Sequence, residues 1–229
     1  MTIVIASEKT WNKHLAHDFR LSRPNDTIHI IDDKRELSAV ILREIHPTFI
    51  FFPHWSSIIP SEIYENYQCI VFHMTDLPFG RGGSPLQNLI TRGIKETRIS
   101  AVKVVKKIDA GDIYLKEPLS LLGSAEEIYI RASEIIFGKM IPHIIDNSPV
   151  PIPQVGEITN FARRTPDMSE LLSSMTETQI FDHIRMLDAE GYPKAFIKFG
   201  EYTLRFSRAK RTHGGIIADV EIGGYTEND

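Results

Sequence analysis

The segment over residues 73–87 has the residue types that a ligand-binding loop requires. It reads His-Met-Thr-Asp-Leu-Pro-Phe-Gly-Arg-Gly-Gly-Ser-Pro-Leu-Gln and follows the apolar run 69–72. Its glycines let the backbone approach a ligand closely, and Ser84 before Pro85 is typical of a helix start, whose N–H groups would face that ligand. Histidine readily exchanges a proton near neutral pH. The segment therefore predicts a site built around His73.

Asp109 is the second candidate, in the sequence Ile-Asp-Ala-Gly-Asp over residues 108–112. Taken alone it is most simply a turn residue, because this composition is typical of tight turns. His73 taken alone is most simply a packed histidine. A carboxylate beside an imidazole, however, stabilises the imidazolium form and fixes the ring. We therefore expect the two side chains to matter as a pair.

The elements around these residues predict an α/β fold. Continuous apolar runs at 3–6, 28–31, 49–52 and 69–72 are typical of buried parallel strands, and helical patterns such as 37–45 and 61–67 separate them. We expect a Rossmann-like, mostly parallel sheet with helices on both faces. Ligands bind at the carboxyl ends of strands in such sheets, which is where His73 lies.

The second half of the chain continues with mixed elements. In order, it predicts an antiparallel strand pair at 99–105 and 113–122, a long helix from Ser124 to about Ile144, a helix from Thr176 to about Ala189, and strands at 195–199 and 202–206. Four prolines surround the exit of the long helix, which indicates a domain boundary near 147–153. We expect a catalytic domain over 1–150 and a small α+β extension over 151–229.

The amino-acid composition excludes several kinds of protein. The chain has 229 residues with 42% apolar and 24% charged, which is typical of a globular protein. The net charge of -4 argues against nonspecific nucleic-acid binding. The single cysteine, Cys69, excludes an internal disulfide, and neither Cys-x-x-Cys nor His-Glu-x-x-His occurs, so we expect no metal. No signal sequence or membrane span is indicated, and we expect a cytoplasmic protein with no membrane partner.

Three motifs in this order resemble the catalytic domain of formyltetrahydrofolate-dependent formyltransferases, and the resemblance covers most of the chain. The motifs are Phe51-Phe52-Pro53 running to Ile58-Ile59-Pro60; His73-x-Thr75-x-Leu77-Pro78 with Arg81-Gly82 and Pro85-x-Gln87; and Ile108-Asp109-Ala110-Gly111-Asp112. Downstream, Arg163-Arg164-x-Pro166 is similar to the extension that follows the catalytic domain in this family. Each motif alone is a weak signal, but the ordered set is fairly specific.

The resemblance implies transfer of a formyl group from 10-formyltetrahydrofolate to an amine, with no metal, and with His73 and Asp109 as catalytic residues. The family's third catalytic residue is an asparagine two positions before the histidine, where this chain has Val71. A donor that stabilises the developing oxyanion must therefore come from elsewhere. The candidates are His54, Thr75 and a backbone N–H of the 80–84 loop, with His54 favoured because it ends the neighbouring strand.

The resemblance also implies binding residues for the two substrates. The folate is expected to contact the 53–56 loop and the 104–109 segment, through Trp55, Ser56, Val105, Ile108 and Asp109. The formyl acceptor is expected to contact Arg81, Gly82, Gly83, Arg163 and Arg164, whose cations would bind a diphosphate. The cluster of Arg205, Arg208, Lys210 and Arg211 is the second choice for phosphate.

The family admits several acceptors, and size and charge are used to choose among them. Enzymes that act on initiator tRNA carry a further basic domain, which this acidic chain lacks, and enzymes that act on a glycinamide ribonucleotide lack the Arg163-Arg164 extension. We therefore expect a nucleotide-linked amino sugar in glycan biosynthesis, a small-molecule partner, and no nucleic acid. The alternatives are a methionyl-tRNA formyltransferase-like enzyme, an inactive folate- or nucleotide-binding protein, and a hydrolase of the formyl donor. A homodimer remains open.

Overall fold

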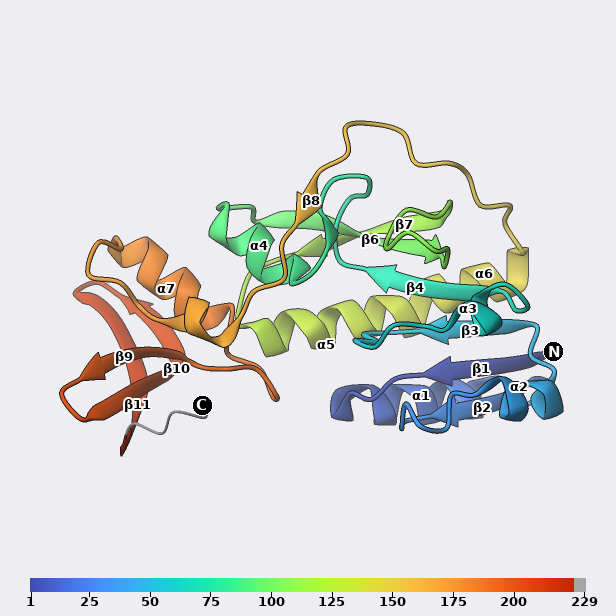
Figure 1. Cartoon of the computed structure of the whole chain (residues 1–229), viewed down its shortest axis with the longest axis horizontal. Coiled ribbons are helices and arrows are strands. Elements are labelled where there is room, and N and C mark those ends of the chain that lie inside the picture. Colours follow the sequence, from blue (N-terminus) through green and yellow to red (C-terminus); the bar gives the residue numbers. More distant parts are fainter. Residues whose placement is uncertain (225–229) are drawn as a thin grey trace. The chain divides into compact units, whose positions relative to one another are not determined.

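A computed structural model describes residues 1–224 and contains a six-stranded sheet (Figure 1). The strands are β1 (Thr2–Ala6), β2 (Thr27–Ile31), β3 (Phe49–Phe52), β4 (Cys69–His73), β6 (Glu96–Lys103) and β7 (Ile113–Ser120), in the order β2-β1-β3-β4-β6-β7. Strands β2, β1, β3 and β4 are parallel, whereas β6 is antiparallel to β4. The predicted α/β fold with a mostly parallel sheet is confirmed.

Strands β6 and β7 form the antiparallel pair expected from the sequence. The Lys103 N–H donates to the Asp112 carbonyl at 2.9 Å near one end, and the Leu121 N–H donates to the Lys95 carbonyl at 2.8 Å near the other. The turn between the strands contains Asp109. The turn begins beside the start of β4, where the Val104 N–H donates to the Cys69 carbonyl at 2.9 Å, and it folds back to bring Asp109 to His73 at the end of β4.

Both faces of the central strands are apolar, as the unbroken runs predict. On one face, β-strand residues such as Val4 and Phe52 pack with Leu42 of α2 (Ala39–Ile45) and Ile63 of α3 (Ser61–Tyr64). On the other, Phe51 stacks with Phe49 and Phe72. Strands buried on both sides are rigid, so the residue that follows each strand is placed accurately.

Two of the remaining helices begin at capping boxes that the sequence predicts. The elements are α1 (Thr10–Ser22), α4 (Pro85–Thr91), α5 (Ala125–Ile135), a π-helical turn η1 (Ile136–Met140), α6 (Ile141–Asn147), a 3₁₀ turn η2 (Pro166–Ser169) and α7 (Glu177–Arg185). Capping boxes begin α5 at Ser124 and α7 at Thr176. The predicted long helix is interrupted by η1, because Pro142 has no N–H and its ring crowds the carbonyl four residues before it.

The C-terminal region differs from the prediction in two places. Helix α7 ends at Arg185, since residues 186–189 form turns and the Asp188 carbonyl accepts a hydrogen bond from the Glu126 N–H. A second sheet in this region has three antiparallel strands, β9 (Ala195–Phe199), β10 (Tyr202–Thr212) and β11 (Gly215–Gly224), where the sequence predicts two. The glycines that begin and end β11 hid the third strand from sequence reasoning. Two short strands, β5 (Arg81–Gly82) and β8 (Asn160–Phe161), were also missed.

The chain divides into two compact units that alternate along the sequence. One consists of residues 1–82, 97–119 and 130–160, and the other of 83–96, 120–129 and the chain from 161 onward. The sequence places a single boundary near 147–153, whereas the last crossing between the units falls after residue 160. Within residues 1–224, no helix has the length and apolar character needed to cross a membrane.

The turn after β3 holds a histidine in an unusual backbone conformation. His54 has a φ of 52°, and its ring contacts Trp11 edge-on with the ring centres 6.1 Å apart. The Asn12 amide anchors this turn by donating to the Pro53 carbonyl at 3.3 Å. Burial, and to a smaller extent the charge of Lys9, lowers the pKa of His54 to about 4. His54 is therefore neutral in the folded protein at neutral pH.

This histidine makes stability depend on pH. Its pKa rises to about 6.5 on unfolding, so the unfolded chain binds the proton first and the free energy of unfolding falls as pH drops from about 6.5 toward 4. We expect a loss on the order of 2 kcal/mol from this group. In His54→Asn, which tolerates positive φ, this part of the pH dependence should disappear in urea unfolding at pH 7 and 4.5. Equal losses of the free energy of unfolding in the wild type and in His54→Asn would contradict the assignment of this pH dependence to His54.

A second prediction concerns the β6–β7 turn, where Gly111 has no room for a side chain. A Cβ atom there would lie 1.9 Å from the Lys103 carbonyl oxygen, which is backbone and cannot turn aside. Gly111→Ala should destabilise the protein by about 1–3 kcal/mol in thermal or urea unfolding. Gly138→Ala in η1 is the control, because its Cβ would meet nothing within 4 Å. Equal stability of the two variants would show that the turn is loosely held.

Candidate active site

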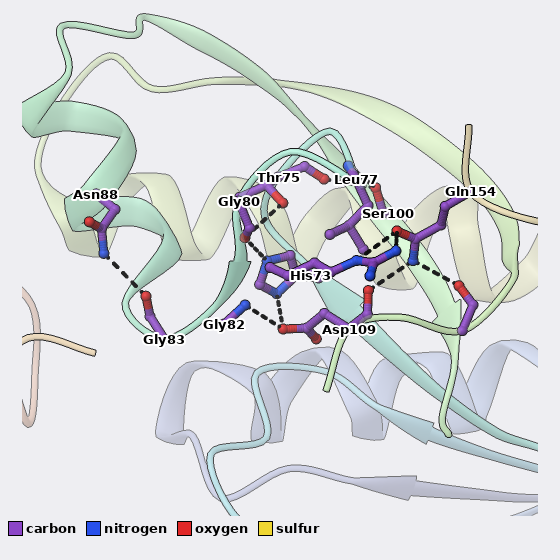
Figure 2. A network of polar contacts seen from close by, with 12 residues as sticks. His73, Thr75, Leu77, Gly80, Gly82, Gly83, Asn88, Ser100, Asp109 and Gln154 are labelled. Atoms are coloured by element: carbon purple, nitrogen blue, oxygen red, sulfur yellow. Dashed lines mark hydrogen bonds and ion pairs between the residues drawn. The ribbon is translucent and has the colours of Figure 1, made fainter. Parts of the chain in front are cut away.

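His73 is the last residue of β4, and its side chain is only 8% exposed. The ring nitrogen Nε2 lies 2.7 Å from the Gly80 carbonyl oxygen (Figure 2). A carbonyl can only accept, so Nε2 carries the proton in this contact. The Thr75 hydroxyl also donates to the Gly80 oxygen, at 3.4 Å. The loop therefore fixes both the orientation and the tautomer of the imidazole.

Asp109 faces the other nitrogen of the same ring. Its Oδ2 atom lies 3.5 Å from His73 Nδ1 and accepts a hydrogen bond from the Gly82 N–H at 2.9 Å (Figure 2). Two unusual backbone conformations make this geometry, with φ at 107° for Gly82 and 52° for Asp109. The structure thus brings together the two residues that the sequence paired, while their catalytic roles stay predictions.

In this arrangement, one ring nitrogen of His73 carries the hydrogen and the other carries the lone pair. Because Nε2–H is held by a carbonyl, the lone pair of the neutral ring is at Nδ1, on the side of Asp109. A proton taken up at Nδ1 would lie next to a carboxylate, which stabilises the resulting imidazolium. The pair can therefore accept a proton from a reacting group and release it again.

Arg81 is 7% exposed and is committed to a protein partner rather than free for phosphate. Its Nε and Nη2 atoms donate to Gln154 Oε1 at 3.1 and 2.7 Å. The Gln154 amide nitrogen donates in turn to the carbonyls of Asp109 and Gly111, each at 2.8 Å (Figure 2). This placement does not support the predicted phosphate contact and makes Arg81 part of the support behind Asp109.

The predicted oxyanion donors are also largely committed. The Thr75 hydroxyl donates to Gly80, and the N–H groups of Arg81, Gly82 and Gly83 donate to the carbonyl of Thr159, the Asp109 carboxylate and the carbonyl of Phe161, respectively. His54 packs against Trp11. Val71 contacts two apolar clusters, which explains a valine there by packing. No described residue is thereby identified as a replacement for the family's asparagine.

The predicted folate residues remain available for an apolar ligand. Trp55 contacts Phe52 edge-on and packs on the same apolar cluster as Val104. Its indole N–H is buried without an acceptor among residues 1–224. Ser56 is exposed, and Val105 and Ile108 are 36% and 65% exposed. Exposed apolar side chains such as Val105 and Ile108 suit contact with a flat, largely apolar ligand.

The other predicted acceptor-binding residues lie in the second compact unit. Gly83 is packed so closely that an added Cβ would lie 2.6 Å from the Arg163 Cβ atom. Arg164 donates through Nη2 to the Met168 carbonyl, and burial lowers its pKa. Arg163 is exposed. In the second-choice cluster, Arg208 pairs with Asp219 and Arg211 lies over the Phe181 ring.

Sequence reasoning missed two residues of this site, the Gly80 carbonyl and the Gln154 side chain. Gly80 is one of the glycines expected to let the backbone approach a ligand, and nothing in a sequence indicates which carbonyl a ring will meet. Gln154 lies among the prolines that were interpreted as a domain boundary. Cys69 is a buried core residue, and burial raises the pKa of its thiol to about 12.

Known proteins share both the sequence and the fold. Residues 166–223 match the family model described as methionyl-tRNA formyltransferase, C-terminal domain. A solved structure named methionyl-tRNA formyltransferase from Clostridium thermocellum is 55% identical, with a TM-score of 0.97 over 98% of this chain and 100% of that one. A methionyl-tRNA formyltransferase from Bacillus thuringiensis (strain Al Hakam) is 31% identical over 85% of this chain. The chain spans 65% of the length of that curated relative.

A sugar N-formyltransferase from Shewanella sp. FDAARGOS_354 shares only the fold. It has a TM-score of 0.73 and 14% identity over 93% of this chain and 98% of that one. The predicted amino-sugar acceptor, the glycan pathway and the exclusion of nucleic acid are therefore wrong, because a protein of the same short length and 55% identity is named for methionyl-tRNA. The error came from expecting a further basic domain in an enzyme that acts on initiator tRNA, whereas this chain covers 100% of the Clostridium thermocellum protein of that name.

The three motifs follow one another in the order expected for the family, and the sheet carries them. A solved relative is 55% identical over 98% of this chain. The chain therefore belongs to the formyltransferase family, among the proteins named methionyl-tRNA formyltransferase.

Proposed function

We propose that the chain transfers a formyl group from a formyltetrahydrofolate to the amine of methionyl-tRNA. The observation that carries the proposed chemistry is the His73 ring, held at Nε2 by the Gly80 carbonyl at 2.7 Å and facing Asp109 with Nδ1 at 3.5 Å. The choice of acceptor rests on the names of the relatives.

The proposed formyl donor supplies an activated formyl carbon. Trp55 would hold it through the buried indole N–H, which has no acceptor among residues 1–224, and Val105 and Ile108 would supply apolar contacts. Each of these residues follows a strand or lies in the β6–β7 turn. The residues present therefore fit a pterin-like ring with acceptor atoms.

In the proposed reaction, His73 acts on the proton of the attacking amine. An amine attacks only when it is uncharged, and it must lose a proton as the new C–N bond forms. Nδ1 of His73 accepts that proton while Nε2–H stays on the Gly80 carbonyl. Asp109, held by the Gly82 N–H, stabilises the imidazolium until the proton moves to the departing nitrogen.

A second candidate is a folate-binding protein without turnover. It is favoured by Val71, which packs in the core where the resemblance implies a hydrogen-bond donor, and by the commitment of the N–H groups of residues 81–83 to protein acceptors. A missing oxyanion donor would slow transfer by about 10²–10³-fold. Turnover and binding must therefore be measured separately.

The test of the acceptor follows tetrahydrofolate release and acceptor labelling with 10-formyltetrahydrofolate carrying a labelled formyl group. The acceptors are methionyl initiator tRNA, uncharged initiator tRNA and a panel of nucleotide-linked amino sugars. We expect label only on methionyl-tRNA. Label on a sugar would overturn the acceptor, release without an acceptor would indicate hydrolysis, and donor binding without release would favour the second candidate.

The roles of the two catalytic candidates have a separate test. His73→Ala should lower kcat by about 10²–10⁴-fold, since it removes the proton acceptor. Asp109→Asn should also lower kcat, because an amide cannot stabilise the imidazolium by charge. Asp112→Asn in the same turn is the matched control and should retain wild-type turnover. Comparable kcat in all three variants would exclude the proposed proton transfer, provided that thermal unfolding shows each to be folded.

A further inference from the structure

Gln154 lies in the segment that follows α6, where an edge pairing holds the chain against β7. The N–H and carbonyl of Ile152 exchange hydrogen bonds with Ile113, at 3.0 and 2.8 Å. Two residues later, Gln154 reaches the turn between β6 and β7. The segment is therefore anchored to the sheet directly before the glutamine.

The Gln154 amide makes four contacts with two different parts of the candidate site. Its oxygen accepts from Arg81 Nε at 3.1 Å and Nη2 at 2.7 Å, and its nitrogen donates to the carbonyls of Asp109 and Gly111 at 2.8 Å each. An amide has one acceptor end and one donor end, and both are used here. Gln154 thus joins the loop after β4 to the turn that carries Asp109.

The two groups joined in this way are those whose geometry sets the position of the Asp109 carboxylate. Asp109 has a φ of 52°, which a residue other than glycine adopts only when neighbouring contacts hold it. The residue after Arg81 is Gly82, whose N–H binds Asp109 Oδ2 at 2.9 Å. Gln154 holds Arg81 and the Asp109 carbonyl at a set distance from each other. It therefore also holds the Asp109 carboxylate in place relative to Gly82 and His73.

We propose that Gln154 is a positioning residue for formyl transfer, which holds the Asp109 carboxylate in place for His73 by joining Arg81 to the 109–111 turn. This inference rests on the proposed function for its kinetic consequence. It assigns Arg81 and Gln154 to the support of the site instead of to the binding of phosphate. Neither residue contacts His73 through the hydrogen bonds described, so both act through Asp109 and Gly82.

A simpler role for Gln154 would be to satisfy the buried guanidinium of Arg81. The two roles differ in what a glutamate at this position can do. Glutamate would still accept from Arg81, but its carboxylate would face the carbonyls of Asp109 and Gly111, which it repels. If only Arg81 matters, Gln154→Glu should function normally. If positioning matters, Gln154→Glu should fail together with Gln154→Met.

The experiment compares Gln154→Met, Gln154→Glu and the exposed control Glu157→Gln in the full chain. Steady-state kinetics gives kcat and KM for 10-formyltetrahydrofolate, thermal unfolding reports folding, and NMR follows the shift and hydrogen exchange of the Gly82 amide. We expect kcat to fall on the order of 10- to 100-fold in both Gln154 variants, with donor KM unchanged. The Gly82 amide should exchange faster and shift upfield as its contact with Asp109 weakens. Glu157→Gln should match the wild type.

The outcomes separate this inference from the proposed function. Wild-type kcat with an unchanged Gly82 amide in Gln154→Met would overturn the positioning role, and full rescue by Gln154→Glu would reduce it to pairing with Arg81. If the wild-type protein transfers no formyl group to any acceptor, the proposed function fails, and the Gly82 amide alone then decides whether Gln154 positions Asp109. If Gln154→Met does not fold, Gln154→Glu, which retains a partner for Arg81, gives the answer.

Discussion

The site depends on one carboxylate oxygen with two neighbours. Asp109 Oδ2 accepts from the Gly82 N–H and lies 3.5 Å from His73 Nδ1. These three residues come from a strand end, a glycine-rich loop and a hairpin turn. Their meeting requires positive φ values at Gly82, where glycine adopts them readily, and at Asp109, where the left-handed conformation costs free energy that the surroundings must offset. Other residues of the first compact unit hold these two backbone conformations in place.

The sheet holds His73 in place, and the side-chain amide of Gln154 holds the turn that carries Asp109. Strand β4 is buried and parallel to β3, so the position of His73 is rigid. The turn between the antiparallel strands β6 and β7 folds back along β4 to bring Asp109 to His73, and Gly111 allows the turn to close against Lys103. The Gly80 carbonyl then sets the ring of His73, while Gln154 secures the turn. The two side chains proposed to transfer the proton are thereby held in a fixed geometry, which is what efficient acid–base catalysis requires.

The sequence was sufficient for the strands and for the central pair, because both follow from local patterns. Unbroken apolar runs predicted β1 to β4, and polar residues directly after a strand indicated His73. The Gln154 contacts were not predictable, since they join residues 81, 109 and 154 through tertiary geometry. The π-helical turn before Pro142 was missed because the apolar helical pattern continues past this proline to Ile144, and the third strand β11 was missed because glycines begin and end it. The acceptor was predicted wrongly because a further basic domain was expected of a tRNA-acting enzyme, and a 55% identical relative of matching length carries that name.

The central claim is that His73 and Asp109 act as one unit, and a double-mutant cycle on kcat/KM tests it most directly. The measurement compares His73→Gln, Asp109→Asn and the double variant with the wild type for formyl transfer to methionyl-tRNA. The account predicts that the double variant loses about as much as the more damaged single variant. Losses that multiply would show that the two side chains act independently and would contradict the account.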